Sequence, residues 1–282
     1  MKGNGMESDE AAPAAHPQLR ELYKRYGCCM AYVAVERDGD ENIGGAFHVG
    51  DGVFVTARHV VDGAKIREMR LTNVDLYYRS ELFPKQEDGS FIIKSDTPRI
   101  CTDFDGRLEV IEGPWFHPND AIDVAVLRVR GMEPNAHYIP LGSNLDDWVG
   151  NGDFELSEVL VLGYPPIPFT RRPALIAAAS YVNAVVDLDL GGNWQMHFLL
   201  SGVPRGGFSG GVALSHWGFA LGVVTQSLLN QVGPPELGYF AATSVEVVWQ
   251  TLALSGTLPE VQKDGWDGFW DEVRSRAAHP SS

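Results

Sequence analysis

Short apolar runs separated by turn-forming residues fill most of the chain. Ala31–Val35 is typical, because it consists of apolar residues and leads into the turn Asp38-Gly39-Asp40. Runs of this kind, bounded by Gly, Pro or Asp, predict β-strands. The predicted strands of the first half are Ala31–Val35, Ala46–Val49, Val53–Thr56, Val74–Tyr78, Phe91–Ile93, Leu108–Ile111 and Val124–Val129.

A second series of apolar runs begins near Val159, after a polar, turn-rich segment from Gly131 to Phe154. Such a segment is typical of a crossover between two lobes. Because closure into a barrel removes the exposed edges of short strands, we expect an all-β fold of two six-stranded antiparallel barrels. The predicted strands of the second lobe are Val159–Leu162, Leu175–Val186, Gln195–Leu200, Val212–Leu214, Ala220–Thr225 and Tyr239–Ala242.

Apolar residues at helical spacing flank these strands. Leu19–Tyr26 predicts a short N-terminal helix, and Val245–Leu254 and Trp266–Val273 predict two C-terminal helices. Four regions follow from these patterns. They are a flexible tail over 1–16, the N-terminal helix and first barrel over 17–135, the second barrel over 136–250, and a C-terminal helical extension over 251–282.

Charge and cysteine content exclude several classes of protein. The 37 acidic residues exceed the 22 Lys and Arg residues, so the net charge is −15 and nucleic acid is not an expected partner. No apolar stretch approaches the roughly 18 residues of a membrane span, and the N-terminus lacks the apolar run of a secretory signal. Cys28, Cys29 and Cys101 are too few for a disulfide framework. We therefore expect a cytoplasmic protein without membrane contact.

Three residues stand in settings that suggest chemistry. His59 follows the predicted strand Val53–Thr56, Asp123 opens an apolar strand, and Ser209 lies between glycines. Flanking glycines permit a tight turn that presents a hydroxyl and points successive backbone N–H groups into one concavity. We expect the backbone N–H groups of Gly207 and Ser209 to form such an anion site.

Acyl transfer requires this set of groups. An imidazole removes the proton of a weakly nucleophilic serine, and a carboxylate on the other ring nitrogen fixes the tautomer. Preorganised N–H donors stabilise the oxyanion, each contributing about 2.7–4 kcal/mol. The sequence therefore predicts a nucleophilic serine, Ser209, assisted by His59 and Asp123.

The motifs around these residues resemble those of the chymotrypsin-like (trypsin-like) serine peptidases. Thr56-Ala57-Arg58-His59 is similar to the family's Thr-Ala-Ala-His motif, and Ser209-Gly210-Gly211 to its nucleophile motif. Asp123 opens a strand similar to the family's acid-bearing strand. Further similarities lie at Gly44-Gly45, at Leu221–Thr225 and Gly238–Phe240, which match the strands beside the substrate, and at Val161–Pro165, which resembles a turn of bacterial Deg-type members.

The resemblance runs from Ala31 to Trp249 and implies a serine endopeptidase that forms an acyl-enzyme. Two departures qualify it. Phe208 stands where the digestive members carry an aspartate, and residues 1–40 contain no matching activation-cleavage sequence. The resemblance thus implies a bacterial-type intracellular peptidase that acts on proteins or peptides. A regulatory protein partner or a signal, rather than zymogen cleavage, would control it.

The resemblance also implies the residues of the substrate pocket. Val203 would lie at its base, Ser227 and Gly238 on its walls, and Thr225 on the strand that pairs with the substrate backbone. Because none of these side chains is charged, a charged substrate residue would lose its hydration without gaining a partner. We therefore expect a preference for an uncharged, apolar residue before the scissile bond.

Two alternatives remain open. Asp120 competes with Asp123 as the acid, although only the short apolar segment Ala121-Ile122 follows it. The second alternative is a catalytically silent protease fold that binds a peptide or partner. The remaining histidines lack ligand spacing, so neither a metal nor a cofactor is expected. We expect His197 to pack in the core and Cys101 to act as a small buried residue.

Overall fold

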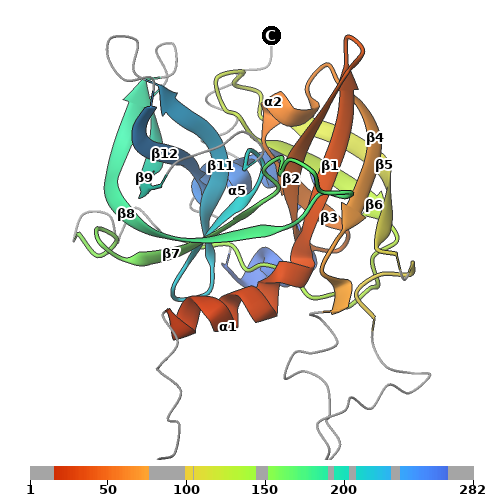
Figure 1. Ribbon diagram of the computed structural model, residues 1–282, viewed down its shortest axis with the longest axis horizontal. Helices are drawn as coiled ribbons and strands as arrows, with labels where there is room; N and C mark the ends of the chain where they lie inside the picture. Colours follow the sequence, from red (N-terminus) through yellow and green to blue (C-terminus); the bar gives the residue numbers. More distant parts are fainter. Residues whose placement is uncertain are drawn as a thin grey trace, which may run out of the picture.

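A computed structural model describes residues 16–75, 99–103, 105–143, 152–189, 194–202, 208–229 and 236–265. Its strands form two closed barrels that lie side by side (Figure 1). The first barrel has the strand order β1-β2-β3-β6-β5-β4. Its strands are β1 (Met30–Arg37), β2 (Asp40–Gly50), β3 (Val53–Thr56), β4 (Lys65–Leu71), β5 (Arg107–Phe116) and β6 (Ala125–Arg130).

The second barrel has the order β10-β11-β12-β9-β8-β7, and all neighbouring strands pair antiparallel, as in the first barrel. The predicted all-β fold of two six-stranded antiparallel barrels is confirmed. The strands of the second barrel are β7 (Glu158–Gly163), β8 (Ile176–Asp189), β9 (Trp194–Ser201), β10 (Val212–Ser215), β11 (Ala220–Leu229) and β12 (Glu236–Ser244).

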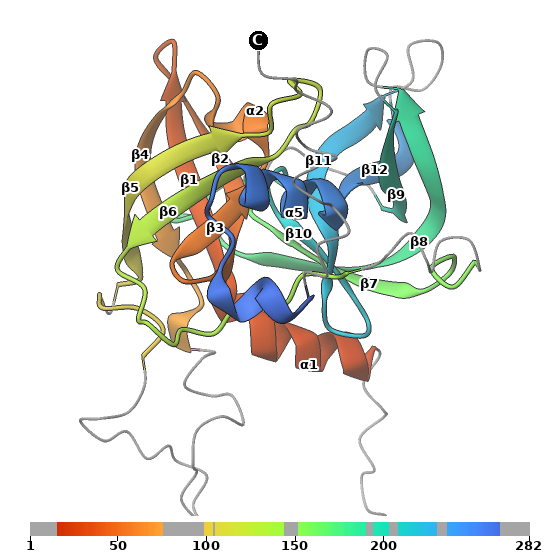
Figure 2. The same ribbon diagram turned by 180° about the vertical axis from the view of Figure 1, so that it is seen from behind.

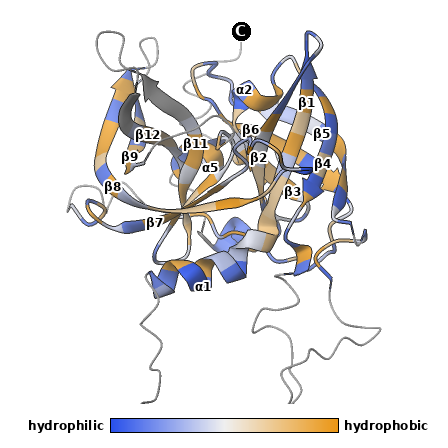
Figure 3. Ribbon diagram, viewed as in Figure 1, coloured by the Kyte–Doolittle hydropathy of each residue, from blue (hydrophilic) through white to orange (hydrophobic). Residues whose placement is uncertain are grey.

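Apolar strand residues supply the core of both barrels. All four residues of β3 and all four of β10 are buried, and hydrophobic residues concentrate along the strands (Figure 3). One continuous cluster of buried residues joins the two barrels, from Leu19 in the N-terminal helix to Leu252 near the C-terminus. The barrels therefore share one hydrophobic core.

Short helices flank the barrels. The predicted N-terminal helix is present as α1 (Pro17–Tyr26), which contacts β7 and leads through η1 (Gly27–Cys29) into β1. A single helical turn, α2 (Arg58–Val61), follows β3. The predicted helix Val245–Leu254 is present as α5, and none of the described helices is long and apolar enough to cross a membrane. The prediction over Trp266–Val273 lies outside the described residues.

The C-terminal part of the chain is hydrogen-bonded to the segment between the barrels, which contains Ile139 and Leu141. α5 and η2 (Glu260–Gly265) lie across the barrels on the side seen in Figure 2. From η2, the buried Gln262 amide donates to Val49 O at 2.8 Å and to Ile139 O at 2.9 Å. Its Oε1 accepts from Leu141 N at 3.2 Å. One side chain thus ties η2, β2 and the inter-barrel segment together.

One predicted strand is wrong. The sequence pattern predicts a strand over Val74–Tyr78, but Val74 and Asp75 are helical, and the fourth strand of the barrel is Lys65–Leu71. Its pairing with β1 shifts register between Ala34 and Val35, so a bulge interrupts the alternation of inward residues. The period-2 pattern that identifies a strand is therefore broken within β4. The predicted strand Phe91–Ile93 lies outside the described residues.

Candidate active site

His59 lies on the single turn of α2. In Figure 1, α2 lies on the side of the first barrel that faces the second. β3 ends at Thr56, and the extended Ala57 precedes the turn. Arg37 of β1 braces the turn, because its Nη2 donates to His59 O at 2.9 Å and to Asp62 O at 2.6 Å. The imidazole keeps 48% of its surface exposed, so it is accessible to a bound molecule.

Asp123 binds His59 through both carboxylate oxygens. Oδ2 lies 2.6 Å from His59 Nδ1, and Oδ1 accepts the backbone N–H of His59 at 2.8 Å. A carboxylate only accepts hydrogen bonds, so Nδ1 carries the proton and Nε2 is left as the basic nitrogen. The Asp123 side chain is 17% exposed, and β6, which follows it, is largely buried. This pair has the chemistry of a general base held in one tautomer.

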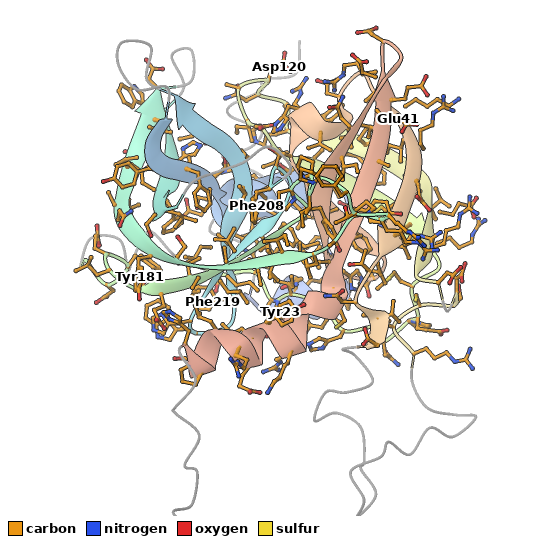
Figure 4. All side chains as sticks on the ribbon, viewed as in Figure 1. Tyr23, Glu41, Asp120, Tyr181, Phe208 and Phe219 are labelled. Atoms are coloured by element: carbon orange, nitrogen blue, oxygen red, sulfur yellow. The ribbon has the colours of Figure 1, made fainter. Side chains whose placement is uncertain are left out.

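Asp120, the alternative acid, binds a different residue. Its Oδ1 accepts from Nη1 of Arg58 at 2.8 Å, and its side chain is 89% exposed. Figure 4 shows Asp120 at the top edge of the molecule, between the two barrels in this view. Asp123, and not Asp120, is therefore the carboxylate paired with His59.

The backbone around Ser209 is joined to the first barrel. Gly45 N donates to Ser209 O at 2.8 Å, while Gly210 N donates to Val224 O of β11 at 2.8 Å. Gly211 N closes a turn onto Phe208 O at 2.8 Å. Ser209 thus lies in a hydrogen-bonded turn of the second barrel that docks against β2, the strand next to the one that leads to His59.

Gly210 makes this docking possible. Its φ of +77° lies in the left-handed region, and a Cβ there would collide with Gly45 O and the Thr56 hydroxyl. Thr56 Oγ1 itself donates to Gly45 O at 2.7 Å. Only a residue without a side chain lets the Ser209 turn approach β2 and the end of β3 this closely.

The described residues contain no direct hydrogen bond between the Ser209 hydroxyl and the His59 imidazole. Such bonds are often long in ligand-free active sites and shorten when substrate binds. The backbone contacts of Ser209 and the pairing of His59 with Asp123 are therefore the observed parts of the arrangement. The serine–histidine contact is not one of them.

Two of the predicted site residues, Gly207 and Val203, lie outside the described residues. Phe208, which follows Gly207 in the sequence, packs closely on Gly163 at the end of β7, between the barrels in Figure 4. The backbone of Ser209 remains as the described part of the predicted anion site. The aromatic ring beside it occupies the position at which the sequence departs from the digestive peptidases.

The predicted pocket strands lie next to each other. Ser227 of β11 pairs with Phe240 of β12, the strand that contains Gly238. Thr225 is buried, and its hydroxyl lies 2.9 Å from that of Thr243. The side chain of Thr225 is thus enclosed within the second barrel.

His197 continues this buried polar chain. Its Nε2 lies 3.1 Å from Thr243 Oγ1, and its Nδ1 lies 2.8 Å from Gln195 O. Burial lowers the pKa of His197, although the charges of Asp187 and Asp123 oppose this effect. His197 is fully buried, as expected of a core residue.

Cys101 is buried in the structure. Burial raises the pKa of the Cys101 thiol to about 11, which suits a small buried residue better than a nucleophile. The side chains of the described residues include no cluster of three or more His, Cys, Asp or Glu suited to a metal.

Sequence reasoning missed the arginines around His59. Arg37 lies 22 residues before His59 and acts on its backbone, and Arg58 binds Asp120 across 62 residues. The departure of Arg58 from the family's Thr-Ala-Ala-His motif was the one available signal. An arginine that lies near two aspartates, as Arg58 lies near Asp62 and Asp120, favours an ion-pair network.

Comparison with known proteins identifies the family. A profile of the trypsin-like peptidase domain matches residues 44–223, more than half of the chain. No curated protein matches the chain at a significant level.

Solved structures show the same fold at low identity. The HtrA-type protease AlgW with a tripeptide is 17% identical with a TM-score of 0.53, and the match covers 85% of this chain and 65% of AlgW. A substituted form of AlgW with a tripeptide is 15% identical with a TM-score of 0.51, and the match covers 85% of this chain and 63% of that form. A serine endoprotease from Yersinia pestis is 15% identical with a TM-score of 0.50, and the match covers 86% of this chain and 67% of that protein.

The chain spans less than two thirds of the length of both AlgW structures. The likeness in fold agrees with the match in sequence, because the profile covers residues of both barrels. The chain belongs to the trypsin-like peptidase domain family and has the fold of a serine endopeptidase.

Proposed function

We propose that the protein is a serine endopeptidase in which Ser209, His59 and Asp123 form the catalytic triad. The observation that carries this proposal is the double hydrogen bond of Asp123 to His59, next to the strand on which the Ser209 turn docks. An oriented imidazole beside a serine in a glycine-rich turn is the arrangement that acyl transfer requires.

The roles of these residues follow from their chemistry. His59 Nε2 takes the proton of the Ser209 hydroxyl as Oγ attacks the carbonyl carbon of the scissile bond. The same proton then goes to the leaving amine as the C–N bond breaks and the acyl-enzyme forms. Water, activated by His59, hydrolyses the ester. Asp123 stabilises the imidazolium, and the N–H groups of Gly207 and Ser209 stabilise the oxyanion.

The substrate we propose is a protein or peptide with an uncharged, apolar residue before the scissile bond. Val203, Ser227 and Gly238 would line the pocket for that residue. A tripeptide is bound to two of the HtrA-type structures of similar fold. This likeness supports an extended peptide as the class of ligand.

We further propose a cytoplasmic protease controlled by a partner or a signal. Cys28, Cys29 and Cys101 are free and buried, which suits a reducing compartment. Phe208 replaces the aspartate that a cleaved zymogen would use, so control by a new N-terminus has no acceptor. A protein partner acting on the turn around Ser209 would supply the control instead.

A catalytically silent binding module is the second candidate. The fold and the family match are compatible with it, because neither of them demonstrates turnover. A silent module would bind peptides through the same strands without turning them over. Turnover therefore separates the two candidates.

The test is a comparison of the cleavage sites that the wild-type protein and the Ser209→Ala variant produce in a lysate, read by mass spectrometry of new N-termini. We expect sites that follow apolar residues and depend on Ser209. Efficient cleavage only after Arg or Lys would contradict the proposed pocket. Identical peptide lists for both proteins would favour the binding module.

A further inference from the structure

Two consecutive residues of α2 each bind an aspartate of the loop between β5 and β6. Arg58 Nη1 donates to Asp120 Oδ1 at 2.8 Å, and His59 Nδ1 donates to Asp123 Oδ2 at 2.6 Å. The two bridges run between the same two segments of the chain, with separations of 62 and 64 residues. They form two neighbouring links between one helical turn and one loop.

The Arg58 guanidinium is held on three sides. Its Nε donates to Asp62 Oδ2 at 2.9 Å, and its central carbon lies 4.7 Å from the ring centroid of Phe116. Only 20% of the side chain is exposed. A guanidinium that makes two ion pairs and covers an aromatic ring is oriented far better than an isolated surface ion pair. Arg58 therefore joins α2 to the end of β5 as well as to the loop.

The loop that contains both aspartates is braced by its own hydrogen bonds. Asn119 N donates to His117 Nδ1 at 3.0 Å, and Asn119 Oδ1 accepts from Ala121 N at 3.0 Å. Ile122 N closes the turn onto Asn119 O at 3.0 Å. Because this turn connects Asp120 to Asp123, a restraint on Asp120 is transmitted to Asp123.

We infer that Arg58 and Asp120 are positioning residues, which hold the loop so that the Asp123 carboxylate stays bound to His59. Asp120 then serves the triad without being its acid. The consequence for catalysis rests on the proposed serine peptidase function, whereas the consequence for the orientation of His59 does not.

The test measures both consequences on the full-length chain. The tautomer of His59 is read from ¹⁵N-histidine NMR spectra, with the His59→Gln spectrum for assignment. The rate of covalent labelling is measured with a fluorophosphonate probe. The variants are Arg58→Gln, Asp120→Ala and, as a matched control, Arg67→Gln. Arg67 is also paired with a carboxylate, that of Glu36, but on β4.

In the wild type and in Arg67→Gln we expect His59 to carry its proton on Nδ1. In Arg58→Gln and Asp120→Ala we expect a mixture of tautomers and a labelling rate lower by about tenfold, as misplacement of a catalytic group produces. Arg58→Lys, which keeps the charge but not the fork of donors, should give an intermediate rate. Asp120 is almost fully exposed, so Asp120→Ala tests the inference even if Arg58→Gln does not fold.

An unchanged tautomer in both variants overturns the inference, whatever the labelling rate. A changed tautomer supports it. Suppose that the wild type shows the expected tautomer and the variants lose it, while the wild type is never labelled; in that case the proposed function fails and the positioning role stands. If the wild type is labelled and the variants match it in rate and tautomer, the positioning role fails alone.

Discussion

Asp123 binds the backbone N–H of His59 with one carboxylate oxygen and the imidazole Nδ1 with the other, at 2.8 and 2.6 Å. The first contact fixes the position of the residue and the second fixes the orientation of its ring. Because the backbone contact does not depend on the ring, Asp123 holds the α2 turn even when the imidazole is protonated. Structure and proton chemistry thus depend on the same carboxylate.

The substitution Asp123→Asn tests this dependence. An amide can donate to Nδ1 and so favours the wrong tautomer, which lowers turnover by about 10⁴-fold in triads of this kind. Asp120→Asn is the matched control, because it changes an aspartate three positions away that binds Arg58 instead. Because Asp120 is proposed to position the loop and not to be the acid, we expect a loss of about tenfold at most, far smaller than that of Asp123→Asn. Equal losses in the two variants, measured as kcat/KM on a common peptide, would contradict the assignment of Asp123.

A second prediction concerns Gly210, which follows the proposed nucleophile Ser209. Gly210→Ala places a Cβ against Gly45 O and Thr56 Oγ1 at a positive φ, so the Ser209 turn must move away from β2. Gly63→Ala is the control, because Gly63 also has a positive φ, +66°, but a Cβ added there would have no other atom within 4 Å. We expect the control to lose about 1–2 kcal/mol from backbone strain alone. Gly210→Ala should lose more, and urea unfolding measures both.

A third prediction is that two histidines make the stability of the protein depend on pH. They are His48 of β2 and His137 of the segment between the barrels. Burial lowers the pKa of His48 to about 4 and that of His137 to about 4. Both are therefore neutral in the folded protein, whereas the unfolded chain takes up protons below about 6.5. Stability should be highest above pH 6.5 and fall as the pH decreases toward 4, with a slope approaching about 1.4 kcal/mol per pH unit for each histidine.

Urea unfolding between pH 7 and pH 4.5 measures this slope. His48 Nδ1 lies 2.8 Å from His137 O, and its Nε2 accepts from Gly52 N, so the neutral ring is bound on both sides. His48→Gln should reduce the slope because one titrating group is lost. A flat profile in the wild type would show that neither histidine is held in its neutral form.

A fourth prediction concerns the connection of η2 to both β2 and the inter-barrel segment. Gln262→Ala removes three hydrogen bonds to buried backbone groups, and each unsatisfied group costs about 1–3 kcal/mol. We expect a loss of more than about 3 kcal/mol in the free energy of unfolding. Lys263→Ala is the control, since Lys263 is exposed and pairs only with Glu260 in the described residues. It should change stability by less than about 0.5 kcal/mol.

Much of this arrangement could be predicted from the sequence because local patterns determine it. Apolar runs bounded by turn residues identified most strands, and the setting of His59 after β3 and of Asp123 before β6 indicated the pair that the structure brings together. β4 was not predicted, because a bulge opposite Ala34 and Val35 breaks the alternation of its inward-facing and outward-facing residues. A bulge depends on the partner strand, which the local sequence of β4 does not contain.

The contacts that decide between Asp120 and Asp123 are long-range. Nothing in the loop itself shows that Arg58 binds Asp120 while its neighbour His59 binds Asp123. The choice depends on how α2 lies against the end of β5, where Phe116 meets the guanidinium. The longer apolar run after Asp123 already favours it in the sequence, and the packing of the elements shows which carboxylate binds His59.

The most direct test of the proposed triad is to locate the residue that a fluorophosphonate probe modifies. The account predicts one covalent adduct per chain, mapped by peptide mass spectrometry to Ser209 and lost in Ser209→Ala and His59→Ala. An adduct on another residue would contradict the account, as would a folded protein that remains unmodified with and without candidate partners.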